Sequence, residues 1–321
     1  MSSVKHNIKW GPQGSSIGIL DFIAQSNDNL DMVPEDEKFK FIDDNTVTDV
    51  VDVKKIGMAS YNVKQHVPSD VPSHNQIIPN NNLKSQEYMT SISKWSDNMK
   101  MKLNPKKCTN IIFNFSQNHQ FSTNITVKEH VIQTVDKTRL LGTIIDNKLK
   151  WDLNTEKLVK EANKRLFILS KASQFTSRIS DLKAIYNSKV RSILETSCVV
   201  WHSSLTLQHR AALERIQKAA CRIILKNSYE SYDQALTDLN METLEVRRRK
   251  LCIKFAKSCL KHEKFRSMFP VNKSSHKMDK KHGKNKFFET KCKTERYKKS
   301  SIPFMQRILN EENRTLERMI G

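Results

Sequence analysis

Two neighbouring carboxylates, Asp43 and Asp44, are the residues near the N-terminus whose types and spacing suggest chemistry. Phe39, Phe41 and Val47 alternate with polar residues around them, which predicts two short strands with the carboxylates at the tip of a β-hairpin. Adjacent carboxylates repel each other by about 4 kcal/mol at a separation of ~4 Å and an effective dielectric constant of ~20. A divalent cation removes that repulsion, and Mg²⁺ binds one or two carboxylates together with substrate phosphates. Taken alone, an Asp-Asp pair is more often a solvated turn.

Three further motifs surround this pair, in a fixed order. Upstream lies Gly-Pro-Gln-Gly-Ser-Ser-Ile-Gly at 11–18, and downstream lie Asn-Pro-Lys-Lys-Cys at 104–108 and Arg-Leu-Leu-Gly-Thr-Ile-Ile-Asp at 139–146. Together with the Asp-Asp pair, this order resembles the second half of the reverse transcriptase of LINE-type (non-LTR) retrotransposons, especially the jockey-like group. The resemblance covers roughly residues 10 to 265, and its strength lies in the joint order and spacing of the four motifs.

The resemblance implies catalytic roles for three residues. Asp43 is the family's metal-binding residue, Asp44 is its weaker partner, and Mg²⁺ is the implied cofactor. Lys107 matches the lysine that is proposed to protonate the leaving pyrophosphate, a role that suits a general acid with a tunable pKa. A solvated lysine at a strand edge is the alternative interpretation of Lys107.

The resemblance also implies nucleic-acid contacts. Gln13 and Gly14 match the loop that contacts the template, where small residues let the backbone approach closely. Leu141 and Gly142 match the primer grip, although apolar residues at such a site are also typical of a core. The implied partners are an RNA template and a DNA primer, and no protein partner is indicated.

The sequence departs from the family pattern in ways that predict an incomplete enzyme. Trp10 stands where the family has Gly, and Ile19 stands where it has Pro. The third catalytic Asp of the family precedes the Pro-Gln-Gly loop, as do the fingers elements, but only ten residues precede that loop here. Because Mg²⁺ demands near-octahedral coordination, we expect this chain alone not to polymerise. Whether the chain is an enzyme therefore stays open.

Charge is segregated along the 321 residues. Residues 1–82 contain 7 Lys and Arg against 11 Asp and Glu, whereas residues 83–321 contain 48 against 23, a net charge of +25. Such an excess favours a polyanionic partner, most simply nucleic acid. Within it, Arg215, Lys218, Arg222 and Lys226 fall on one face of a predicted helix, opposite its apolar face, and could follow a phosphate backbone. The run 247–250, Arg-Arg-Arg-Lys, adds a second cluster; a solvated helix face is the alternative for both.

The elements that position these residues predict an α+β fold. Residues 1–148 are expected to form a partial reverse-transcriptase palm, an antiparallel sheet with helices, interrupted by a flexible segment at 51–82. In this part a helix is predicted over 83–99, a strand over 109–115, and two or three strands over 121–146. Residues 149–268 are expected to form an all-α, thumb-like domain. Residues 269–321 are expected to form a basic disordered tail with a short C-terminal helix, because 271–300 has 11 Lys and Arg against 3 acids.

The helical pattern is the strongest structural prediction. Leu182, Ile185, Tyr186, Val190 and Cys198 belong to an apolar set with helical spacing, with Asp181 as the expected cap. Further helices are predicted after Thr206 and over about 241–261. The six cysteines form no Cys-x2-Cys pair and are expected to be reduced core thiols.

Three interpretations of function remain open. The first is a fragment of an RNA-directed DNA polymerase that lacks the fingers and the first catalytic Asp. The second is a basic nucleic-acid-binding remnant without catalysis. The third is a product in which only about 150–265 folds stably. No secretory signal or long apolar run is present, so we expect an intracellular protein, nuclear or cytoplasmic, that is neither secreted nor membrane-bound.

Overall fold

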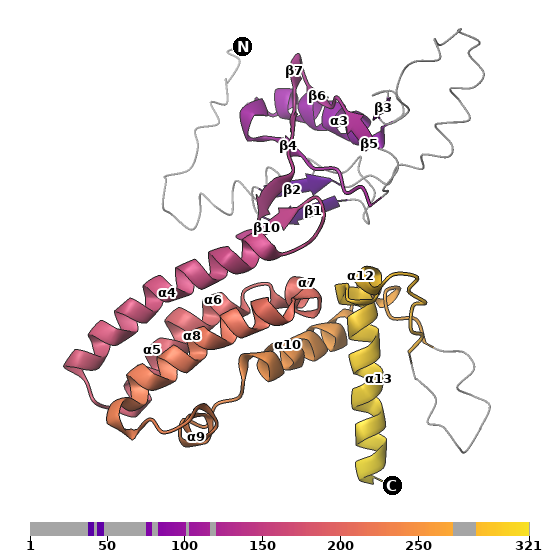
Figure 1. Ribbon diagram of the computed structural model, residues 1–321. Helices are drawn as coiled ribbons and strands as arrows, with labels where there is room; N and C mark the ends of the chain where they lie inside the picture. Colours follow the sequence, from indigo (N-terminus) through magenta and orange to yellow (C-terminus); the bar gives the residue numbers. More distant parts are fainter. Residues whose placement is uncertain are drawn as a thin grey trace, which may run out of the picture. The chain divides into compact units, whose positions relative to one another are not determined.

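The computed structural model describes residues 38–41, 44–47, 75–78, 83–100, 103–115, 120–271 and 287–320. Within these residues the chain is α+β, mostly helical, with five two-stranded sheets. It divides into two compact units, 1–138 and 139–321, which are coloured indigo to magenta and magenta to yellow in Figure 1. No helix of the described part is long and apolar enough to cross a membrane.

The first unit contains the predicted hairpin. Strands β1 (Lys38–Phe41) and β2 (Asp44–Val47) are antiparallel, and Phe41 is paired with Asp44. The prediction of two strands flanking the Asp pair is therefore confirmed. Asp44 begins β2, while Asp43 lies outside the described residues.

Part of the segment that was expected to be flexible forms a strand. β3 (Asn75–Ile78) pairs in parallel with β5 (Gln120–Thr123). A parallel pair needs a long crossover connection, and here helix α3 (Lys84–Asn98) lies in the intervening sequence. The expectation for 51–82 is wrong at these four residues, and the rest of that segment lies outside the described part.

Helix α3 confirms the helix predicted over 83–99. Its buried Tyr88 and Ile92 face inward, and the helix packs beside β6 (Thr126–Val127), which forms a hairpin with β7 (His130–Val131). The side-chain amide of Gln86 links α3 to β6 by two hydrogen bonds. Its Nε2 donates to the Thr126 carbonyl at 3.1 Å, and its Oε1 accepts from the Thr126 N–H at 2.8 Å.

The Asn-Pro motif forms a short turn. Asn104 caps the 3₁₀ helix η2 (Pro105–Lys107) by accepting from the Lys106 N–H at 3.1 Å, and Pro105 fits the first helical position. The strand predicted over 109–115 is only two residues long, β4 (Thr109–Asn110), and pairs in parallel with β8 (Gln133–Thr134). The prediction of two or three strands over 121–146 was too low, since six short strands lie between Gln120 and Asp146.

The second unit confirms the predicted helical region. Its first helices are α4 (Asp152–Phe175) and a continuous helical stretch made of α5 (Ile179–Ile185), the π-helix η3 (Tyr186–Arg191) and α6 (Ser192–Glu195). The predicted apolar set is inward: Leu182, Tyr186, Val190 and Cys198 are buried. Asp181 is not the cap, because α5 begins two residues earlier and Asp181 lies in its first turn.

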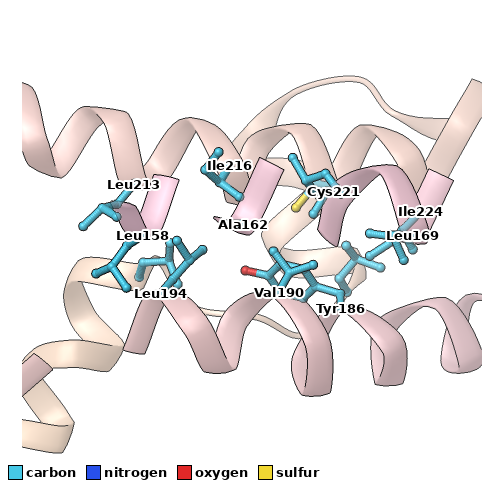
Figure 2. Packing of buried hydrophobic residues seen from close by; sticks show 14 of the residues in the cluster. Leu158, Ala162, Leu169, Tyr186, Val190, Leu194, Leu213, Ile216, Cys221 and Ile224 are labelled. Atoms are coloured by element: carbon cyan, nitrogen blue, oxygen red, sulfur yellow. The ribbon is translucent and has the colours of Figure 1, made fainter. Parts of the chain in front are cut away.

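The next helical segments are α7 (Cys198–Trp201), η4 (His202–Ser204), α8 (Leu207–Leu225), η5 (Lys226–Ser228), α9 (Tyr232–Asp238), α10 (Leu244–Cys259) and α11 (Glu263–Arg266). Of these, α7, α8, α9 and α10 contribute buried residues to one main core. Thr206 caps α8 by accepting from the His209 N–H at 3.2 Å. Figure 2 shows side chains from α4, η3 and α8 meeting in this core, including Ala162, Val190 and Cys221.

Within residues 287–320, the expected disorder is wrong for 287–300, whereas the expected C-terminal helix is confirmed and is longer than predicted. Helices α12 (Glu295–Lys298) and α13 (Ser301–Ile320) lie there, and Met305, Ile308 and Leu309 of α13 are buried against α10 in a second core. Polar residues of α13 also anchor the chain before it. Asn310 exchanges hydrogen bonds with the Phe287 backbone at 2.9 and 3.0 Å, and Gln306 accepts from the Thr290 N–H at 2.8 Å.

Candidate nucleic-acid interface

Helix α8 presents the predicted row of cations. Its inward positions, among them Leu213, Ile216, Ala220 and Ile224, are buried in the main core. Because a helix repeats every ~3.6 residues, positions 215, 218 and 222 fall on the other side, and Lys226 follows directly after the last helical residue. We call Arg215, Lys218, Arg222 and Lys226 the α8 stripe.

Two members of the stripe are ordered by tyrosine rings. The Lys218 ammonium lies 4.9 Å from the centre of the Tyr232 ring, and the Arg222 guanidinium lies 5.1 Å from the centre of the Tyr229 ring. Both distances are within the range of cation–π attraction. These tyrosines were not among the predicted binding residues, and their only signal in the sequence is their position just beyond the end of a basic helix.

The other two members differ. Arg215 is exposed, whereas Lys226 adopts a positive φ of 51° where α8 ends and donates to the Ser173 carbonyl at 2.7 Å. No member of the stripe forms an ion pair with a carboxylate of the described residues. Glu214, the acid nearest in sequence, accepts from the Tyr232 hydroxyl and from the Leu244 N–H at 3.2 Å. The stripe is therefore an uncompensated row of positive charge.

The second predicted cluster does not form a basic surface. Arg247 pairs with Glu195 at 2.6 Å, Arg249 pairs with Glu311, and Lys250 pairs with Glu242. The expectation that the run 247–250 acts as one patch is wrong. Consecutive residues of a helix lie ~100° apart, so they meet different neighbours.

Arg248, the fourth member of that run, is fully buried. Its guanidinium lies 5.8 Å from the centre of the Trp201 ring, and its Nε donates to Nδ1 of His202 at 3.4 Å. Burial, followed by the positive charges of Arg248, Arg210 and Arg249, lowers the pKa of His202 to about 3. Burial likewise lowers the pKa of Arg248. This pair lies inside the fold at the junction of η4 and α10 and is not available to a ligand on the surface.

Leu141 and Gly142 form the tight turn of a hairpin between β9 (Lys137–Leu140) and β10 (Thr143–Asp146). Their φ angles are 46° and 83°, and positive φ at both positions is typical of a type I′ turn. Leu141 is 51% exposed, so it is not a core residue. Lys157 of α4 donates to the Gly142 carbonyl and holds the turn in place.

Asp146 connects this hairpin to α4. Its carboxylate accepts from the N–H groups of Lys148 at 2.9 Å, Lys150 at 3.0 Å and Trp151 at 3.3 Å. Asn154 Oδ1 in turn accepts from the Ile144 N–H at 3.1 Å. In the sequence Asp146 is only the last residue of a motif, but in the structure its carboxylate orders the chain between β10 and α4.

The predicted catalytic residues do not gather in the described part. Lys107 is exposed at the end of η2, the side chain of Asp44 is not described, and Asp43, Gln13 and Gly14 lie outside the described residues. Among the residues that the structure describes, no three His, Cys, Asp or Glu side chains lie close enough to hold a metal ion. The predicted sets that the described structure brings together are thus the α8 stripe and the turn at Leu141 and Gly142.

Comparison with known proteins identifies no relative: no family model, curated protein or solved structure matches this chain.

Proposed function

We propose that this protein binds nucleic acid through the α8 stripe of its helical unit. The observation that carries the proposal is the row of four cations, exposed or half-buried, that no carboxylate of the described residues neutralises. From residue 215 to residue 226 the chain rises about 16 Å, over which one strand of a duplex rises by roughly five nucleotides at ~3.4 Å each along the duplex axis. The stripe therefore has the length and charge to follow a phosphate backbone.

The arrangement favours backbone contact over base reading. The rings of Tyr229 and Tyr232 lie against the cations of the stripe, so they support the charged groups and are not free stacking platforms. Contacts to phosphates fix position and carry no sequence information. We expect binding that depends strongly on salt and weakly on sequence.

The test is a salt series of fluorescence anisotropy with a labelled RNA–DNA hybrid. Four phosphate contacts would contribute a fall of about 3.6 in log K for each tenfold rise in salt. The double variant Arg215→Gln with Arg222→Gln should reduce that slope by about 1.8. Lys160→Gln with Lys164→Gln, an equal charge change on the exposed side of α4, is the matched control. Equal slopes for the two variants would contradict the proposal.

A polymerase relationship is a second candidate, supported by the observed β1–β2 hairpin and by the order of the four motifs. The proposal is that the chain corresponds to part of the palm and the thumb of an RNA-directed DNA polymerase of a non-LTR retrotransposon. Asp43 and Asp44 would bind Mg²⁺, with the template and primer contacting Gln13, Gly14, Leu141 and Gly142. Two carboxylates on one hairpin supply too few ligands for a two-metal site, so we expect no nucleotide incorporation by this chain alone.

Primer extension with Mn²⁺ and a primed homopolymer tests that expectation. Incorporation by the wild-type chain that disappears in Asp43→Asn would show that the site is complete. Absence of incorporation leaves the binding proposal untouched, because the α8 stripe requires no catalysis.

A further inference from the structure

Four lysines line an open groove beside α10 and α13. The groove has a volume of about 620 Å³, and its lining includes Lys250, Lys254, Lys257, Lys261 and Glu312. The lysines are all exposed and follow one another at intervals of four, three and four residues along α10 and its C-terminal end. That spacing places them on one face of the helix. Figure 1 shows α10 and α13 in contact, in orange and yellow.

Carboxylates of the described residues neutralise only two of the four lysines in this groove. Lys250 pairs with Glu242, and Lys257 pairs with Glu312 of α13 at 2.9 Å. Lys254 and Lys261 form no ion pair with any carboxylate of the described residues. The groove therefore holds two uncompensated ammonium groups and a third that a single, partly exposed carboxylate neutralises.

The chemistry of the lining indicates the kind of ligand. Ammonium groups act as strongly hydrated point charges that bind phosphate without the planar fork that guanidinium offers. No aromatic ring is among the lining residues, and Ile253 is the apolar one. The groove can thus attract a chain of phosphates but offers no surface for stacking bases. Its lysines span about 16 Å, as the α8 stripe does.

We propose that this groove is a second phosphate-backbone contact for nucleic acid, in which an incoming phosphate displaces Glu312 from Lys257. The inference rests on the proposed function, since it extends the nucleic-acid contact of the helical unit from α8 to α10. Glu312 acts as an internal competitor: it occupies Lys257 in the free protein and lowers the affinity of the groove for a polyanion.

The first experiment removes the two uncompensated lysines from the full chain. Lys254→Gln with Lys261→Gln should weaken binding of a labelled RNA–DNA hybrid roughly 10- to 60-fold at ~0.1 M salt and lower the salt slope by about 1.8. Lys160→Gln with Lys164→Gln on α4 is again the matched control. Both lysine pairs are exposed, so circular dichroism melting should show the wild-type transition in each variant.

The second experiment gives a gain of affinity, which damage to the fold does not produce. Glu312→Gln frees Lys257 in advance and should tighten binding, with a salt slope equal to that of the wild-type chain, because a phosphate contacts Lys257 in both complexes. Glu156→Gln on α4 makes the same change in net charge at an exposed site and should tighten binding less. A steeper slope in Glu312→Gln, or a gain in affinity equal to that of Glu156→Gln, would overturn the displacement of Glu312.

The outcomes separate this inference from the proposed function. If the wild-type chain binds and Arg215→Gln with Arg222→Gln weakens binding, while the groove variants behave as their controls do, only the groove proposal fails. If the wild-type chain does not bind the hybrid, both proposals fail. Loss of binding to phosphatidylserine vesicles in the lysine variant, with binding of the hybrid unchanged, would overturn nucleic acid as the occupant of the groove.

Discussion

At the scale of single residues, the buried pair His202 and Arg248 shows how the core controls protonation. Nδ1 of His202 accepts from Arg248 Nε, so the neutral ring carries its proton on Nε2. A proton added to the ring would place a second positive charge beside a buried guanidinium. The ring also makes an edge contact with Phe304 of α13, at 5.7 Å between ring centres. His202 is therefore a neutral packing residue that joins η4, α10 and α13.

We predict that His202 makes the fold sensitive to mild acid. Its folded pKa of about 3 lies below the ordinary value of 6.5, so below pH 6.5 the unfolded chain binds a proton that the folded chain does not. Stability is fully present above pH 6.5 and is lost as the pH falls, by about 2 kcal/mol at pH 5. Urea unfolding at pH 7 and pH 5 measures this loss.

The control for this prediction replaces the ring. His202→Asn keeps an acceptor for Arg248 and should remove about 2 kcal/mol of the pH dependence. His130→Asn, at an exposed position, should keep the wild-type dependence. The same pH dependence in both variants would contradict the assignment to His202.

At the scale of helices, one glutamine connects several elements of the main core. Gln217 of α8 is fully buried; its Oε1 accepts from the Tyr186 hydroxyl at 2.6 Å. Its Nε2 donates to the Tyr232 hydroxyl and to the Glu242 carbonyl, both at 2.9 Å. The amide thus links η3, α8, α9 and the segment before α10. A polar residue at an inward helix position needs such a complete set of partners.

We predict that Gln217→Leu lowers the free energy of unfolding by about 2–4 kcal/mol, because it leaves buried polar groups without partners. Tyr186→Phe alone should cost about 1 kcal/mol. In the Gln217→Leu background the same change should cost close to nothing, since the hydroxyl is already unpaired. Urea unfolding of the four proteins gives the coupling, and exposed Gln234→Leu, within about 0.5 kcal/mol of wild type, is the control. Additive costs would show that the two side chains are independent.

The geometry of the helices also explains which basic residues remain available to bind a polyanion. The α8 stripe was predictable because a spacing of three or four residues defines one face. The run 247–250 was misleading because adjacent residues point in different directions, and its partners Glu195 and Glu311 lie 52 and 62 residues away. The row of lysines in the α10 groove has the same periodicity as the α8 stripe, so the sequence already contained the signal that was missed.

At the scale of the whole molecule, the helical unit has two cores that share α10. One face of α10 contributes Leu244 to the main core, while Cys252, Ala256 and Cys259 pack against α13 in the second core. Burial raises the pKa of the Cys252 thiol to about 12 and also raises the pKa of Cys259. Both thiols are therefore protonated and shielded near neutral pH.

We predict that removing the C-terminal helices exposes the second core but not the main one. In a chain that ends at residue 286, Cys252 and Cys259 should react with a thiol reagent much faster than in the full chain, because the thiolate is the reactive species and burial suppresses it. Mass spectrometry after timed labelling identifies the modified cysteines. Cys198 and Cys221, buried in the main core, serve as internal controls and should stay protected. Equal protection of Cys252 and Cys259 in both chains would contradict the packing of α13.

The sequence by itself determined the periodic features: the helical unit, the inward apolar faces, the helix that follows Thr206, the strands around Asp43 and Asp44, and the row of cations on α8. These follow from local geometry, since a spacing of two or three to four residues defines a face. Only the tertiary structure decided that the run 247–250 is divided between ion pairs and a buried arginine, that Asn310 and Gln306 anchor 287–290, and that four lysines line a groove with Glu312. Each of these depends on partners that fold back from distant parts of the chain, and local spacing carries no information about which carboxylate or carbonyl will lie opposite.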